Sequence, residues 1–396
     1  MKYIIYIDIL GFQAFAEDIS EQKGIDVQDV RKHLVETIKS RVDSLKYKDK
    51  IIGKKYGHSD DWILLTDSLD NIFLIISSIL NHNTGYTNFE KINREVAASC
   101  GEFDNNGALF GLDLIVSDDI IKFYKNNIIG AYRSWFKSQF NRSPTDTYLI
   151  IDEKLYKEFS KTEKTICSEV VLTNSKSPIY LSNIEKFKKR SKIIEFLEII
   201  SSNRLEYREI EALYVEPKEY NEIKNILNKN NIVLIIGDPE IGKTYTSIRL
   251  LLDCFDQGFV PTIAKRGDEL IRYCENLYEL EGKAIYIEDP WGKIKSTFFE
   301  NDLREIGNLI LDVKTYNTKI IISSRERIFD EFNSKKETSE NILQLVQKIK
   351  IGFSYNLENM KEMLQRYIMV FEPKWSNDDD TKISVLNLVW KKLRTP

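Results

Sequence analysis

The stretch NIVLIIGDPEIGKTYTSIRLLL, which begins at Asn231, limits the possible folds of this chain more than any other part of the sequence. A continuous apolar run, which is typical of a buried parallel strand, leads into a glycine-rich loop and then into a helical pattern. Gly237 and Gly242 allow the loop to bend tightly and to turn backbone N–H groups inward. The start of the following helix adds positive potential. The sequence therefore predicts a phosphate-binding loop inside an α/β domain.

Two side chains of this loop have the chemistry that a nucleoside triphosphate requires. Lys243 can reach the terminal phosphates, and Thr244 can offer its hydroxyl to Mg²⁺. A second apolar run, KAIYIED, ends in Glu288 and Asp289. One of these acids would belong to the Mg²⁺ shell while the other orients water, and the sequence leaves open which does which.

A third apolar run, TKIIISSRER, ends in Ser323, Ser324 and Arg325. Polar residues at the end of such a strand can sense the terminal phosphate. The lead-in YVEPKEYNEIKNILNKN, the loop, the EDPWG element and the SSRE element occur in this order. Together they resemble the novel STAND NTPases of bacterial defence proteins over about 210–350. This resemblance implies that bound Mg-ATP acts as a conformational switch, and whether ATP is hydrolysed or only bound stays open.

The first half of the chain places carboxylates beside apolar strands. Asp8 interrupts the run YIIYIDIL, and Asp60 and Asp61 immediately precede WILL. A buried charge costs folding energy unless a partner offsets it. If the strand 3–9 and the hairpin 51–66 are neighbours, Asp8 and Asp60 converge. With the carbonyl of Ile9 they form a site for two Mg²⁺ or Mn²⁺ ions, which prefer oxygen ligands.

The order of elements in this half favours an α+β fold of ferredoxin-like type. We expect strands at 3–9, 51–57, 61–66, 94–101 and 148–152, and helices at 25–46, 67–82, 113–126 and 154–160. Such a site could activate a ribose 3′-hydroxyl and hold the triphosphate during attack on the α-phosphorus.

The segment Asp8-Ile9-x-Gly11-Phe12 resembles the metal-binding signature of class III nucleotide cyclases, and this resemblance covers about residues 1–155. It implies a ferredoxin-like cyclase domain in which Asp8 and Asp60 are catalytic and, with Ile9, bind the metals. Asp61 is the alternative to Asp60. Phe12 would belong to the substrate site.

This chain differs from the purine cyclases at two places, and both differences bear on which nucleotide is the expected substrate. Four residues before Asp60, where those enzymes carry Lys or Glu, this chain has Tyr56, which can stack on or bond to a smaller base. Their transition-state Asn and Arg have no counterpart in FGLDLIVSDDIIKFYKNN. Arg94, Arg133 or a lysine would supply the positive charge instead.

Both departures make the domain similar to the pyrimidine cyclases of Pycsar antiphage systems. The resemblance implies a lyase that converts UTP or CTP to cyclic UMP or cyclic CMP and pyrophosphate. A homodimer and a separately encoded effector, which binds the cyclic nucleotide during phage infection, are also implied. UTP cannot be told from CTP at this point. A purine (adenylate or guanylate) cyclase and a degenerate cyclase-like nucleotide sensor that regulates a STAND ATPase stay open as alternatives.

Length and composition fit this two-domain interpretation. A chain of 396 residues is long enough for two domains. With the two resemblances, we expect a cyclase domain at 1–180, a helical connector at 181–225, an α/β P-loop NTPase domain at 226–350 and a helical tail at 351–396. Acids and bases are interspersed at a net charge of −4, so we expect neither a nucleic-acid nor a membrane partner. The four cysteines form no CxxC pair, which favours reduced thiols in the cytoplasm.

Overall fold

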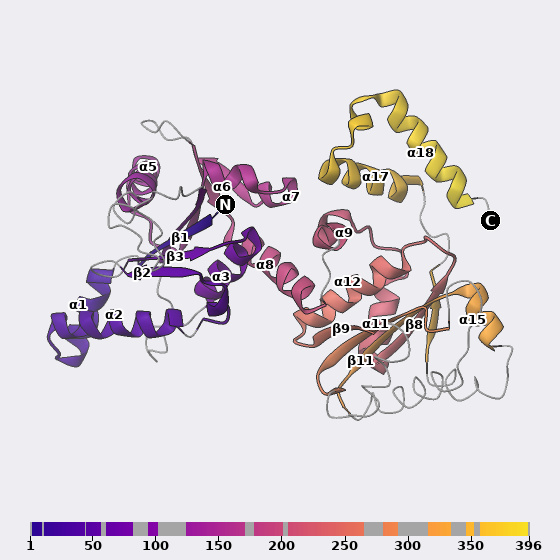
Figure 1. The fold of residues 1–396 in the computed structure, drawn as a ribbon, viewed down its shortest axis with the longest axis horizontal. Helices are drawn as coiled ribbons and strands as arrows, with labels where there is room; N and C mark the ends of the chain where they lie inside the picture. Colours follow the sequence, from indigo (N-terminus) through magenta and orange to yellow (C-terminus); the bar gives the residue numbers. More distant parts are fainter. Residues whose placement is uncertain are drawn as a thin grey trace. The chain divides into compact units, whose positions relative to one another are not determined.

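The computed structural model describes residues 2–9, 12–43, 45–56, 61–81, 94–101, 124–170, 178–200, 205–264, 280–291, 316–333, 346–351 and 357–394. The chain forms two compact units, Met1–Ile194 and Glu195–Pro396 (Figure 1). Their boundary lies within α8 (Ile184–Ile199), whose first turns belong to the core of the first unit. The finer division into four segments stays a prediction. No helix within these described ranges is both long and apolar enough to cross a membrane.

The first unit is built on a seven-stranded sheet with β1 (Lys2–Ile9) near its middle. β1 pairs antiparallel with β3 (Trp62–Thr66) on one side and with β4 (Arg94–Gly101) on the other. β2 (Gly53–Tyr56) pairs antiparallel with β3, which confirms the expected hairpin. The order β2-β3-β1-β4, with helices after β1 and β3, is a β-α-β-β-α-β arrangement.

Three further strands extend this sheet beyond β4. β5 (Tyr148–Asp152) runs parallel to β4, and β7 (Ile179–Ser182) and β6 (Cys167–Val170) follow it antiparallel. β5 was expected from the sequence, whereas β6 and β7 were not. β6 carries two exposed polar residues in its four positions, so it has no apolar pattern to detect.

The helices of the first unit cover both faces of the sheet. Those predicted at 25–46 and 67–82 are present as α2 (Val27–Asp43) and α3 (Leu69–Asn81). α1 (Phe12–Lys23) was not predicted. The helix expected at 113–126 falls mostly outside the described residues, and a π-helical turn, η2 (Tyr124–Ile129), leads into α5 (Gly130–Phe140). The described residues also form η1 (Lys48–Lys50), α6 (Glu153–Glu158), which confirms the helix expected at 154–160, and α7 (Lys161–Lys164).

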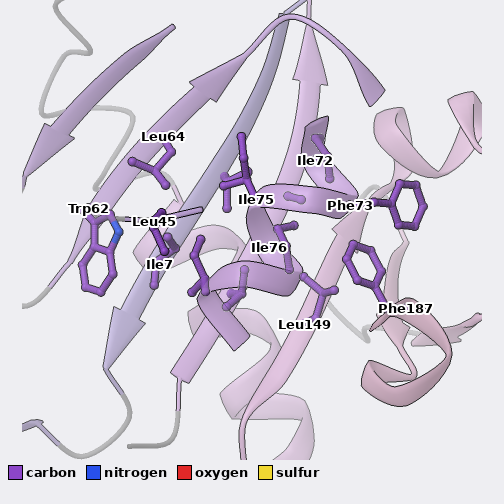
Figure 2. Close-up of a cluster of buried hydrophobic side chains, with 14 of the residues drawn as sticks. Ile7, Leu45, Trp62, Leu64, Ile72, Phe73, Ile75, Ile76, Leu149 and Phe187 are labelled. Carbon is purple, nitrogen blue, oxygen red and sulfur yellow. The ribbon is translucent and has the colours of Figure 1, made fainter. Parts of the chain in front are cut away.

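Two hydrophobic cores lie on opposite faces of the sheet because successive side chains of a strand alternate between faces. Ile5 and Ile7 of β1 pack with α1, α2, α3, α6 and α8. Figure 2 shows this core, in which the rings of Phe73 and Phe187 stack with centroids 4.5 Å apart. Ile4 and Tyr6 pack on the other face with η2 and α5. By the same alternation, Asp8 faces η2 and α5.

The second unit is an all-parallel sheet in the order β12-β8-β11-β10-β9. The strands are β8 (Ile232–Gly237), β9 (Val260–Ala264), β10 (Lys283–Glu288), β11 (Lys319–Arg325) and β12 (Lys348–Lys350). The three apolar runs noted in the sequence are β8, β10 and β11, and their interiors are buried as expected. β11 lies between β8 and β10, so one strand separates the glycine-rich loop from the acid pair.

Helices flank this sheet on both sides (Figure 1). α12 (Lys243–Asp256) packs on β9, β10 and β11, and the short α15 (Glu326–Asn333) packs on a core that includes Trp291 and Phe329. α11 (Tyr220–Asn230) precedes β8, after two short helices, α9 (Leu205–Arg208) and α10 (Ile210–Leu213). The tail is helical as predicted, with α17 (Leu357–Phe371), η4 (Lys374–Asn377) and α18 (Asp379–Arg394).

Candidate functional site

The glycine-rich loop connects β8 to α12 and is shaped by its two glycines. A Cβ atom on Gly237 would lie 2.5 Å from the carbonyl oxygen of Ile351 and 2.3 Å from the side chain of Ile241, so no larger residue fits. Gly242 has a φ of 91° and is the N-cap of α12, a conformation that glycine adopts at little cost. The sequence therefore dictates this loop through two backbone positions.

Lys243 is the first residue of α12 and is 8% exposed. Its ammonium group donates hydrogen bonds to the carbonyl oxygens of Gly237, at 3.0 Å, and Asp238, at 2.6 Å. Burial lowers the pKa of Lys243, the charge of Asp289 opposes this shift, and the charge of Arg325 adds to it. The loop thus holds a lysine charge close to the start of a helix.

The next residue connects the loop to the neighbouring acids. The hydroxyl of Thr244 donates a hydrogen bond of 3.2 Å to the carboxylate of Glu288, at the end of β10. A hydroxyl and a carboxylate in contact are oxygen donors of the kind that Mg²⁺ prefers, so these residues fit the cation. Of the two acids that the sequence left open, Glu288 is the one that contacts Thr244.

Asp289 and Arg325 complete this edge of the sheet. Asp289 has a φ of 45°, and its amide donates a 2.9 Å hydrogen bond to the carbonyl oxygen of Ser323. Arg325 is aligned with Gly237 in the β11–β8 pairing. The structure therefore gathers the predicted residues of the second half at the carboxyl ends of parallel strands, where open α/β sheets bind ligands.

A pair of buried hydroxyls beneath the loop was not predicted as part of this site. Tyr286, in β10, and Ser323, in β11, share a hydrogen bond of 2.9 Å. Tyr286 is 1% exposed and Ser323 is 2% exposed. A tyrosine inside the otherwise aliphatic strand AIYIE, two residues before the first acid, is the sequence signal that could have identified it.

The segment before α11 contacts both α12 and α17. The hydroxyl of Tyr214 donates a 3.1 Å hydrogen bond to Thr246, one turn into α12. The guanidinium group of Arg366, in α17, donates to the carbonyl oxygen of Tyr214 and pairs with Glu362 at 2.6 Å. One residue thus connects the P-loop helix to the first helix of the tail.

The candidate site of the first unit contains two buried carboxylates. Asp8 is 3% exposed, and one of its oxygens accepts a 3.0 Å hydrogen bond from the amide of Ile9 while the other lies 3.4 Å from Arg133 of α5. Asp61 is 5% exposed and lies 3.8 Å from Lys125 of η2. Among the described residues, each acid therefore lies near a basic side chain from the continuous segment η2–α5.

Register indicates which acid faces Asp8. The β1–β3 pairing runs from Tyr3↔Thr66 to Ile7↔Trp62, so the next pair in this series is Asp8 and Asp61. Directly opposed residues have their side chains on the same face. Two carboxylates and the Ile9 carbonyl are an oxygen set that fits Mg²⁺ or Mn²⁺. In the part of the chain that the structure describes, no group of three or more His, Cys, Asp or Glu side chains could hold a metal.

The other residues predicted for this site have different positions relative to Asp8 and Asp61. Ile9 contributes its side chain to the core, and Phe12 is buried in the same core, on the face opposite Asp8. Arg94 is aligned with Ile9 at the start of β4, and burial lowers its pKa. The backbone of Tyr56 pairs with that of Trp62. The side chain of Tyr56 lies outside the part of the chain that the structure describes. Asp60 lies outside the described residues altogether.

The fold and the loop of the second unit define a P-loop NTPase domain. A comparison with protein families identifies its class: residues 214–370 match the family Novel STAND NTPase 3, nSTAND3. A STAND NTPase domain therefore occupies this segment, and the resemblance noted in the sequence is confirmed for it. The matched segment excludes the first unit, so the resemblance to cyclases receives no support from this comparison. No curated protein matches the chain.

Several solved structures share a distant likeness with this chain. A DnaC helicase loader is 13% identical, with a TM-score of 0.27 over 36% of this chain and 95% of its own. The initiator DnaA bound to AMPPCP and single-stranded DNA is 13% identical, with a TM-score of 0.34 over 47% of this chain and 63% of its own. A HORMA:CdnC:Trip13 complex from E. coli MS115-1 is 12% identical, with a TM-score of 0.27 over 52% of this chain and 73% of that chain.

These likenesses are too weak to carry a functional argument. The expectation that the chain has no nucleic-acid partner stays a prediction.

Proposed function

We propose that the second unit binds Mg-ATP and uses it as a conformational switch. The observation that carries this proposal is the contact between Thr244 and Glu288, beside the buried Lys243 that precedes Thr244 in the chain. Thr244 and Glu288 would hold Mg²⁺, which would offset the negative charge of the phosphates. Lys243 holds the terminal phosphates, the loop amides hold the remaining phosphate oxygens, and Asp289 orients water. Arg325, aligned with Gly237, senses the terminal phosphate.

A binding assay with a fluorescent ATP analogue tests this proposal. The wild-type chain should bind the analogue in the presence of Mg²⁺, and Lys243→Ala should abolish binding because the phosphates lose their main cation. Lys229→Ala, an exposed lysine of α11, is the matched control and should bind like the wild type. Tight binding that survives Lys243→Ala would contradict the proposal. A phosphate-release assay on the same samples separates hydrolysis from binding alone.

We further propose that the first unit is a pyrimidine nucleotide cyclase. Two facts support it: the β-α-β-β-α-β order of its sheet, and the buried pair Asp8 and Asp61 at the end of β1. Its ferredoxin-like identity, its homodimer and its role in antiphage signalling through a separate effector rest on the resemblance of the Asp8-Ile9-x-Gly11-Phe12 segment.

The reaction requires positive charge around a triphosphate. The ribose 3′-oxygen attacks the α-phosphorus, the bond to the bridging oxygen breaks, pyrophosphate leaves, and the hydroxyl proton passes to solvent. Divalent cations, when bound, lower the pKa of that hydroxyl and hold the triphosphate. Asp8, Asp61 and the carbonyl of Ile9 would hold them. Arg133 and Lys125, once released from the carboxylates, can pair with phosphate oxygens because both are within reach of the same edge.

Product analysis tests the cyclase directly. The chain is incubated with Mn²⁺ and each of ATP, GTP, CTP and UTP, and cyclic products are identified by mass spectrometry. We expect a product from UTP or CTP and none from the purines. Product from ATP or GTP alone would favour a purine cyclase, and no product at all, with ATP binding intact, would favour a nucleotide sensor.

Three carboxylate variants identify the catalytic acids. Asp8→Asn and Asp61→Asn should each abolish cyclisation, because a neutral amide cannot hold the cations. Asp60→Asn tests the alternative acid, which lies outside the residues that the structure describes. Asp18→Asn, an exposed acid of α1, is the control. Loss in Asp60→Asn with full activity in Asp61→Asn would reverse the assignment of the second acid.

A further inference from the structure

The helical segment that faces the carboxylate pair of the first unit contains a π-helical turn. This turn, η2, continues directly into α5, and Ile129 anchors the junction because it is fully buried in the core on that face of the sheet. A π-helix is rare, occurs mostly as a single turn inside an α-helix, and is frequent at functional sites. Here η2 supplies Lys125 and α5 supplies Arg133, the two bases that lie near the acids.

The π-helical turn explains how both bases reach the same edge of the sheet. Arg133 follows Lys125 by eight positions. In a continuous α-helix of about 3.6 residues per turn, eight residues rotate the chain by about 80° beyond two full turns, so the two side chains would point in different directions. A π-helix has more residues in each turn and therefore rotates less per residue. The turn thus reduces the angle between Lys125 and Arg133.

Gly130 lies at the junction where this turn closes. A Cβ atom there would lie 3.1 Å from the carbonyl oxygen of Lys125, five residues earlier, and this is the residue spacing of a π-helical hydrogen bond. An alanine would press on this carbonyl group, and alanine also favours an ordinary α-helix more than glycine does. Glycine at this position therefore permits the π-helical turn.

The acids and the bases differ in how easily they can separate. The side chains of both acids are 5% exposed, whereas those of Arg133 and Lys125 are 40% and 41% exposed. The two separations, 3.4 Å and 3.8 Å, are longer than the roughly 2.7–2.9 Å of a strong charge-assisted hydrogen bond. A base can therefore move into water at little cost, but a buried carboxylate requires a positive charge beside it. A divalent cation, which prefers carboxylate oxygens, can take the place of the base.

We propose that η2 is an autoinhibitory latch, a turn that keeps the Lys125 ammonium group beside Asp61 and so opposes cation binding there. This inference rests on the cation site proposed for the first unit. When Asp61 accepts a cation, Lys125 leaves it and the turn relaxes toward the α-helical hydrogen bonding of α5. That change rotates Lys125 away from the acid, while Arg133, beyond the turn, keeps its direction.

Titration calorimetry of the full chain with Mn²⁺ alone tests the latch. Lys125→Gln removes the competing charge and should raise the affinity for Mn²⁺ about threefold. Gly130→Ala should raise it by a similar factor, because the turn no longer keeps Lys125 beside Asp61. Since both changes act on the same contact, the double variant should bind Mn²⁺ no more tightly than either single variant. Two independent effects would instead multiply to about ninefold.

Lys137→Gln and Gly24→Ala are the matched controls. Lys137 is an exposed lysine of α5, and a Cβ atom on Gly24 would have no neighbour within 4 Å. Both variants should bind Mn²⁺ like the wild type. Hydrogen exchange adds a second measurement: Mn²⁺ should speed exchange in the peptide that covers η2, because the turn loses the ion pair that holds it.

The outcomes separate the latch from the cation site. Wild-type affinity in Lys125→Gln or Gly130→Ala, or a multiplied gain in the double variant, overturns the latch and leaves the cation site in place. Unchanged or slower exchange of η2 in Mn²⁺ also overturns the latch. If Gly130→Ala does not fold, Lys125→Gln and the exchange measurement decide the question. Absence of Mn²⁺ binding in both the wild type and Lys125→Gln overturns the latch together with the proposed cation site.

Discussion

Gly237 lies against Ile351, the residue that follows β12. Any Cβ atom would collide with the Ile351 carbonyl, and a backbone group cannot move as a flexible side chain can. We expect Gly237→Ala to destabilise the second unit by about 1–3 kcal/mol, as overpacking generally does. Thermal unfolding of the full chain measures this change. Gly282→Ala is the control. Its Cβ atom would have no neighbour within 4 Å, so the only cost is that of placing an alanine at a φ of 69°.

Arg133 has a testable role at the carboxylate pair. It lies 3.4 Å from Asp8, so it competes with a cation for the same oxygen. We expect Arg133→Gln to raise the affinity for Mn²⁺ by up to about fivefold, because an ion pair with a partly exposed arginine contributes about 0.2–1 kcal/mol and its loss frees the acid. Titration calorimetry with Mn²⁺ alone measures this affinity.

Arg142→Gln, an exposed arginine just beyond α5, should leave the Mn²⁺ affinity unchanged. A lower affinity in Arg133→Gln would mean that the guanidinium group supports the cation site instead of competing for it.

Among the helices of the second unit, α17 is connected to α12 through Tyr214. Arg366 bonds the carbonyl oxygen of Tyr214, whose hydroxyl bonds Thr246 of α12. We expect Arg366→Gln to increase hydrogen exchange in α17 and in the segment before α11, because the charged donor of this connection is lost. Mass spectrometry of the exchanged peptides measures it.

Lys361→Gln changes an exposed residue of the same helix and should leave exchange as in the wild type. Equal exchange in Arg366→Gln and the wild type would show that other contacts hold α17 in place.

The elements that could be predicted from sequence are those with a strong local pattern. β8, β10 and β11 are continuous apolar runs because both of their faces are buried, and they were recognised for that reason. α1 was missed because it begins only two residues after β1, within the same apolar stretch. β6 and β7 were missed because strands of four residues have too few positions for an alternation to stand out.

For the whole molecule, the two units allow a test of whether nucleotide binding to one unit also stabilises the other. A ligand at 100 times its Kd stabilises the unit that binds it by about 2.7 kcal/mol. We expect Mg-ATP to raise the unfolding temperature of Glu195–Pro396 and to leave that of Met1–Ile194 unchanged. Hydrogen exchange during heating can follow both units in one sample. Equal protection of both would mean that the nucleotide state of the second unit is coupled to the first.

The sequence by itself determined the chemistry of the P-loop, since Gly237, Gly242, Lys243 and Thr244 are adjacent along the chain and act through local backbone geometry. The tertiary structure decided which distant groups these residues meet. Glu288 rather than Asp289 contacts Thr244, and Asp8 faces η2 and α5 rather than the core of Ile5 and Ile7, because strand order and register assign side chains to faces. A shift of one residue in register would reverse both assignments, and no local pattern records that choice.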